Sequence, residues 1–162
     1  MSTSEESSPS YRFISKANNV YKVSVPKPQG GYRYKSIGSK KIGEGKALKI
    51  AVAERNKIGK EEWGKFWSKV LSDNTLLARL PRSLEPVLRR ASDKKSQHLE
   101  YVSNWMEVDS NGSYIKKGRR YSCEKHGKLG AYIKAKNCLL DAHKSNMELL
   151  SFMGRNPIVN LI

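Results

Sequence analysis

The stretch VYKVSVPKPQGGYRYKSIGSKKIGEGKALKIAVAERNKIG, residues 20–59, changes its hydrophobic period halfway along. It begins with apolar and basic residues in alternation, breaks at Pro-Lys-Pro-Gln-Gly-Gly, alternates again and then becomes alanine-rich with helical spacing. Alternation is typical of strands that bury one face, and a spacing of three to four is typical of a helix that covers that face. The stretch therefore predicts a small antiparallel sheet backed by one helix.

Three strands are predicted, over residues 11–14, 20–25 and 32–37, followed by a helix over residues 44–58 with Gly59 as its C-cap. Because successive side chains of a strand point to opposite faces, we expect Tyr32 and Tyr34 to share the apolar face with Val23. The opposite face would then be basic and open to solvent. Its members would be Arg12, Lys22, Arg33 and Lys35.

Residues 60–71 predict a second helix, because Trp63, Phe66, Trp67, Val70 and Leu71 follow helical spacing. This apolar stripe is expected to pack in the core or between the two lobes, with an exposed partner-binding stripe as the alternative. Residues 72–96 contain Pro81 and Pro86 and predict a linker with a short helix near residues 84–91.

The second half repeats the plan of the first. Short strand-like runs surround a hairpin signal at residues 110–113, and a long helix is predicted from residue 128 onward. Three small residues recur at a constant shift of 84, which favours a duplicated unit, with chance or a shared need in helix packing as the alternatives. These pairs are Gly43 and Gly127, Ala47 and Ala131, and Ala51 and Ala135.

The expected fold class is therefore α+β, with two small units that each pack a three-stranded antiparallel sheet on a helix. The predicted divisions are a disordered tail over residues 1–9, an N-terminal unit over 10–71, a helical linker over 72–96 and a C-terminal unit over 97–162.

Charge is the strongest feature of the composition, with 31 Lys and Arg residues against 15 Asp and Glu residues and a net charge of +16. Such a field favours a polyanion, because each neutralised phosphate releases condensed counterions. No segment has the basic amphipathic character of a membrane-surface helix, and no signal peptide or membrane span is evident. We expect a cytoplasmic protein, associated with the nucleoid in a bacterial host.

Three strands followed by the run SIG…EGKALKIAVAERN are similar to the Apetala-two/ethylene-response-factor DNA-binding domain, versions of which occur in phage proteins, homing endonucleases and integrases. The resemblance covers residues 10–60 and, more weakly, residues 97–153. It implies that the sheet lies in the major groove of DNA with the helix behind it, and that Arg12, Lys22, Arg33 and Lys35 contact the DNA. Tyr21 stands where the plant family commonly has Trp.

The second unit carries a compact basic cluster around Gly118, formed by Lys116, Lys117, Arg119 and Arg120. We expect it to clamp phosphates, with a solvated hairpin as the alternative. Glu107 and Asp109 lie in the strand region of this unit and would repel phosphate if they faced DNA. The first unit is thus expected to supply sequence preference and the second mainly phosphate contacts.

Two pairs of residues have a spacing that resembles a zinc site, Cys123 with His126 and Cys138 with His143. A continuous helix would place Cys138 and His143 about 140° apart around its axis, which favours ordinary buried cysteines over a metal site. No His-Asn-His motif, paired-carboxylate motif or phosphate-binding loop is present in the sequence. We therefore expect no metal, no cofactor and no catalysis.

The leading hypothesis is a double-stranded DNA-binding protein that acts as a transcriptional regulator, a repressor of phage or mobile-element type. The main alternative is a nucleoid-associated protein that coats DNA without sequence preference. A nuclease or recombinase accessory module is a third hypothesis. RNA binding is a fourth, which fits the charge although the sequence shows no motif for base stacking.

Overall fold

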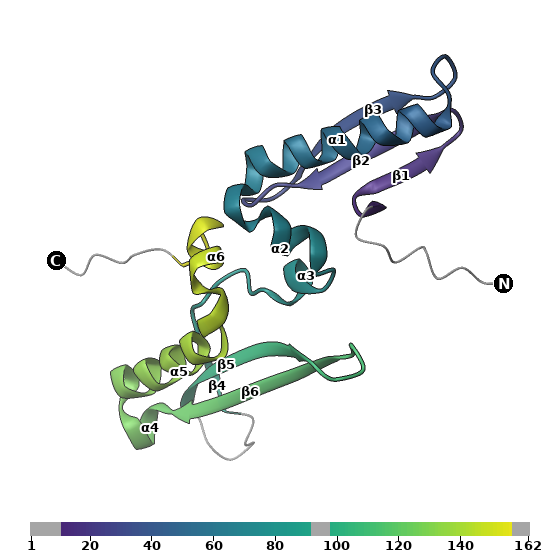
Figure 1. Ribbon diagram of the computed structural model, residues 1–162. Helices are drawn as coiled ribbons and strands as arrows, with labels where there is room; N and C mark the ends of the chain where they lie inside the picture. The colour runs from purple at the N-terminus through teal and green to yellow at the C-terminus, as the bar shows by residue number, and fades with distance from the viewer. Residues whose placement is uncertain (1–10, 92–97, 157–162) are drawn as a thin grey trace. The chain divides into compact units, whose positions relative to one another are not determined.

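The computed structural model describes residues 11–91 and 98–156, and it divides into two compact units between Asn74 and Thr75. Each unit has one three-stranded antiparallel sheet and its own helices (Figure 1). The predicted α+β fold with two small units is confirmed. The predicted tail over residues 1–9 lies outside the described residues.

The sheet of the first unit has the order β1-β2-β3, formed by β1 (Ile14–Ala17), β2 (Val20–Pro26) and β3 (Tyr32–Gly38). The first strand was predicted over residues 11–14, but Phe13 has a φ of 66° and β1 begins after it. The turn to β2 is completed by Asn19 with a φ of 58°, in the left-handed region that Asn tolerates better than most residues.

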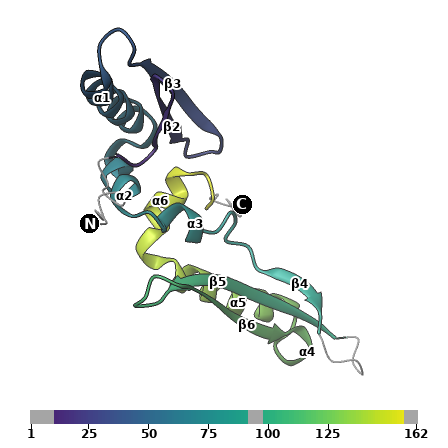
Figure 2. The ribbon, with the colours of Figure 1, turned by 90° about the vertical axis from the view of Figure 1, so that its right-hand side faces the viewer.

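Helix α1 (Glu44–Trp63) covers one face of this sheet (Figure 2). Ala47 and Ala51 are completely buried, and these small side chains let the helix approach the strands closely. The helix runs five residues beyond the predicted range of 44–58, so Gly59 is not its C-cap. A Cβ on Gly59 would lie only 2.2 Å from the ring of Trp67, and the glycine instead gives this indole room to pack.

The tryptophan-rich segment packs in the core of the first unit, as predicted, but not as one helix. Gly64, with a φ of 54°, ends α1, and a 3-10 turn over Gly64–Phe66 leads into α2 (Trp67–Ser72). Trp63 is completely buried and its indole N–H donates to the carbonyl of Pro26 at 2.7 Å. This bond attaches the end of α1 to the end of β2.

The second unit begins with α3 (Leu76–Arg79) and has the sheet order β4-β5-β6, formed by β4 (Val87–Arg90), β5 (Leu99–Val108) and β6 (Tyr114–Ser122). The predicted helix near residues 84–91 is wrong, because these residues include β4. Pro86 disfavours helix for the residue before it, and β4 finds its hydrogen-bonding partner in β5. Part of the predicted linker thus belongs to the second sheet.

After the sheet come α4 (Cys123–His126), α5 (Lys128–Ala142), a 3-10 turn over Lys144–Asn146 and α6 (Met147–Phe152). The single long helix predicted here is wrong, because the chain changes direction at His143. The predicted repetition of strands followed by a helix is confirmed. Gly43 and Gly127 precede their helices with nearly the same φ and ψ, 85° and 156° against 74° and 158°.

Candidate nucleic-acid interface

The strand register decides which side chains of the first sheet face α1. Val23 pairs with Lys35, and Val25 pairs with Arg33. Directly paired residues of antiparallel strands project from the same face, so Arg33 and Lys35 lie on the side of the buried valines and of α1. The predicted basic face is therefore wrong, because a shift of one residue in register exchanges the two faces of a strand.

Arg33 forms ion pairs with α1. Its Nη1 lies 2.8 Å from the Glu61 carboxylate and 3.3 Å from that of Glu62. The hydrogen bond to Glu61 is the largest of the effects that raise the pKa of Arg33. Lys16 of β1 pairs in the same way with Glu44 at 3.0 Å. The acidic residues of α1 thus engage two of the strand cations.

Arg12 precedes β1 and packs against the end of α2 rather than extending from the sheet. Its guanidinium donates to the carbonyl oxygens of Val70, at 2.6 Å, and Leu71, at 3.3 Å. It also lies 4.5 Å from the centre of the Phe13 ring. Burial lowers the pKa of Arg12, with the nearby Asp73 acting in the opposite direction. Arg12 therefore stabilises the first unit.

We refer to the sheet surface that faces away from the long helix of each unit as its open face, although Glu100 and Val102 on this face of the second unit are buried. On the open face of the first unit, Lys22 is the only one of the four predicted DNA contacts. The β3 residues on this face include Ser36, which pairs with Lys22. They also include Tyr34 and Tyr32, which pair with Ser24 and Pro26 and which the alternation of the sequence had placed in the core. Both tyrosines are exposed.

The basic cluster of the second unit is divided between the two faces of its sheet. Arg119 pairs with Ser103, whose hydroxyl donates to the carbonyl of Ala135 in α5 at 2.7 Å, so Arg119 and Lys117 lie on the helix side. Lys116 and Arg120 lie on the open face. All four side chains are exposed.

The open face of the second unit also carries a residue that the sequence interpretation missed. Asn104 pairs with Gly118, which lies between Lys116 and Arg120 on that face. A Cβ on Gly118 would lie 2.6 Å from Asn104 Oδ1, so the glycine leaves room for the exposed amide. The glycine within this basic strand is the sequence feature that could have indicated this position, because a glycine in a strand often marks a close approach of another group.

Glu107 and Asp109, the two acidic residues expected to repel phosphate if they faced DNA, do not oppose an anion on the open face. Glu107 lies on the helix side and accepts a hydrogen bond from the Trp105 indole at 3.1 Å. Asp109 lies in the turn after β5 and accepts bonds from the backbone N–H groups of Asn111 and Ser113. Neither carboxylate lies beside Lys116 or Arg120.

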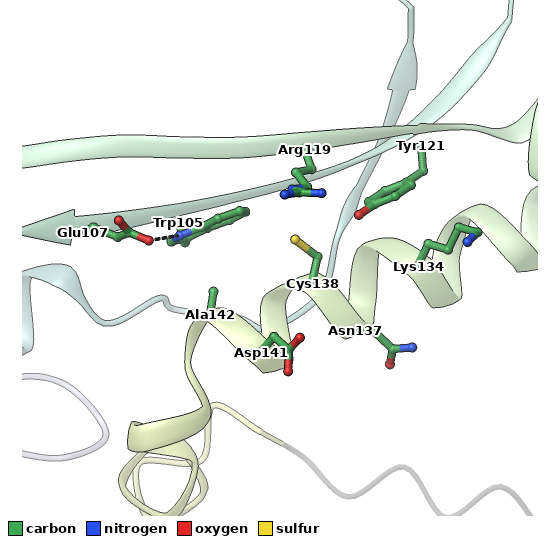
Figure 3. Close-up of a pocket in the computed structure, with 9 residues that line it drawn as sticks. All are labelled: Trp105, Glu107, Arg119, Tyr121, Lys134, Asn137, Cys138, Asp141 and Ala142. Atoms are coloured by element: carbon green, nitrogen blue, oxygen red, sulfur yellow. Dashed lines mark hydrogen bonds between the residues drawn. The ribbon is translucent and has the colours of Figure 1, made fainter.

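A pocket of about 540 Å³ lies between the hairpin and α5 on the helix side. Figure 3 shows the side chains of Trp105, Arg119 and Tyr121 pointing from the strands toward α5, where Cys138 points back at them. Asp141 and Lys134 belong to the helical side of the pocket. The pocket combines charges of both signs, so it does not favour an anion as the open face does.

The cysteines and histidines do not gather into a site. Within residues 11–91 and 98–156, no group of three or more His, Cys, Asp and Glu side chains could hold a metal ion. Cys138 lines the pocket beside α5, whereas His143 is buried after the end of that helix. Burial lowers the pKa of His143, which favours its neutral form.

No family model, curated protein or solved structure matches the chain. Among the helices that the structure describes, none is long and apolar enough to cross a membrane.

Proposed function

We propose that the protein binds double-stranded DNA, with the open face of the second sheet as the main contact surface. One observation carries this proposal: Lys116 and Arg120 flank the exposed amide of Asn104 on that face. Arg89 of β4 lies on the same face and pairs with Glu100 at 3.1 Å. Glu100 is the one acidic residue on the described part of this face, and its charge is thus compensated.

These residue types suit a duplex. Lys and Arg neutralise phosphates and release counterions, and a two-stranded ribbon can enter the major groove. The Asn104 amide has both a donor and an acceptor, the pattern that adenine presents at its major-groove edge. The net charge of +16 adds attraction at longer range. The weaker resemblance of residues 97–153 to sheet-based DNA-binding domains is consistent with the same mode of contact.

The biological role that we propose is transcriptional regulation, by occupying a preferred site and excluding other proteins from it. Coating of DNA without preference requires only the charge of the chain. The Asn104 amide between two cations favours the first role, because an amide distinguishes base edges whereas a lysine on a phosphate does not. No catalytic step is part of the proposal.

The test is selection of bound sequences from a random duplex pool by the full-length protein at physiological salt. We expect one enriched site that competes at least ~10³-fold better than random duplex. Asn104→Ala should reduce this preference while general affinity is kept. Absence of any enriched site would support coating instead, and nicking of a supercoiled plasmid in the presence of Mg²⁺ would contradict a role without catalysis.

A further inference from the structure

The open face of the first sheet presents two aromatic rings that the core does not use. Tyr32 and Tyr34 pair with Pro26 and Ser24, and the two residues are 53% and 72% exposed. Their ring centres lie 6.1 Å apart with 31° between the ring planes. Folded proteins more often cover tyrosine rings at least partly, so an adjacent exposed pair indicates a contact surface.

The other side chains that the structure describes on this face are short or cationic, and none of them is acidic. By register, the other members of this face include Ser15, Lys22 and Ser36, which have short side chains or a flexible cation. Residues 11–43 contain eight Lys and Arg residues and no Asp or Glu. The acidic residues of the first unit that the structure describes lie in α1 and after α2. A polyanion is therefore the partner that the charge of this half favours.

Duplex DNA does not suit the two rings, because its bases already stack on one another and are covered. Unpaired bases expose their flat surfaces and stack on aromatic side chains, while nearby cations follow the backbone. We propose that Tyr32 and Tyr34 form a stacking surface for the unpaired bases of single-stranded DNA, with Lys22 near the phosphates. This inference goes beyond duplex binding, and it rests on the proposed function only for the choice of DNA over RNA.

The test uses the full-length protein and three labelled ligands, a dT20 oligonucleotide, an rU20 oligonucleotide and a 20-base-pair duplex, in fluorescence-anisotropy titrations. The double variant Tyr32→Ala/Tyr34→Ala should lose at least ~30-fold in affinity for dT20, since each stacked base depends on one ring. Its affinity for the duplex should change by less than ~3-fold. Circular dichroism confirms that the variant is folded.

Two further variants serve as controls. The first tests whether the tyrosine hydroxyls rather than the rings bind the DNA, and the second tests whether the loss of any exposed tyrosine weakens binding. Tyr32→Phe/Tyr34→Phe keeps both rings and should bind dT20 like the unmodified protein. Tyr11→Ala removes an exposed tyrosine that precedes β1 and should have little effect.

An unchanged dT20 affinity in the alanine variant, or an equal loss in the phenylalanine variant, would overturn the inference. Binding of rU20 more than ~10-fold tighter than dT20 would overturn the assignment to DNA. Failure of duplex binding alone would overturn the proposed function and leave the single-strand result standing.

Discussion

The two units follow one plan but present different open faces. In each, a glycine precedes the long helix, two buried alanines lie against the sheet, and a 3-10 turn leads to a short final helix. The first open face carries two tyrosines and Lys22, whereas the second carries Lys116 and Arg120 around Asn104. The same fold thus supports a stacking surface in one unit and a cationic surface in the other.

The helix sides of the two sheets differ as well. Helix α1 contains four acidic residues, and three of them pair with strand cations on the helix side. Helix α5 contains Asp141 as its one acidic residue. The number of Lys and Arg residues in a strand therefore does not say how much positive charge its open face presents. The strand register decides it, and the acids of α1 pair with strand cations that the register has placed on the helix side.

The largest effect is expected from Gly59→Ala, which should destabilise the first unit and leave the second unchanged. The added Cβ would lie 2.2 Å from the buried Trp67 ring, and neither the helix nor the indole can move without disturbing the core. We expect a loss of about 3 kcal/mol in the free energy of unfolding. Urea denaturation followed by tryptophan fluorescence measures it.

Gly45→Ala in the same helix is the matched control. Its Cβ would meet nothing within 4 Å, so the substitution should be neutral or stabilise α1 by up to about 1 kcal/mol. Equal stability of the Gly59 and Gly45 variants would show that Trp67 does not pack against the helix as described.

The next largest effect is expected from Arg12→Ala. Removing the guanidinium leaves the carbonyls of Val70 and Leu71 without their donor, which should cost about 2 kcal/mol of stability in thermal or urea unfolding. Lys22→Ala removes the same charge from an exposed position and should change stability by less than about 0.5 kcal/mol. Should Arg12→Ala instead weaken duplex binding without loss of stability, Arg12 would be a DNA contact after all.

The sequence predicted where the strands and the helix of the first unit lie better than it predicted which strand side chains face the helix. Alternation located β2 and β3, and the alanine spacing located the start of α1 at Glu44. The alternation of residues 32–35 fits either orientation, because tyrosine can be buried or exposed. Ile37 could have decided between the two orientations. This aliphatic residue of β3 is buried, and it projects from the same face of the strand as Arg33 and Lys35.

The second unit was harder to predict for two physical reasons. Strand β4 is four residues long and exposed at every position, so it has no burial pattern and depends on its pairing with β5. The break after α5 occurs at His143 without a Gly or Pro to mark it. The candidate site depends on tertiary register in the same way, because Asn104 joins Lys116 and Arg120 only when β5 and β6 pair.

The most direct test of the proposed interface compares two double variants of β6 that remove the same charge from opposite faces. Lys116→Ala/Arg120→Ala changes the open face, and Lys117→Ala/Arg119→Ala changes the helix side. Affinity for a 20-base-pair duplex is measured by fluorescence anisotropy between 50 and 300 mM salt. The open-face variant should lose at least ~30-fold in affinity, and the magnitude of its log K against log salt slope should fall by about 1.8, whereas the other variant should lose less than ~5-fold. Equal losses in the two variants, or a larger loss in the helix-side variant, would contradict an interface on the open face of the second sheet.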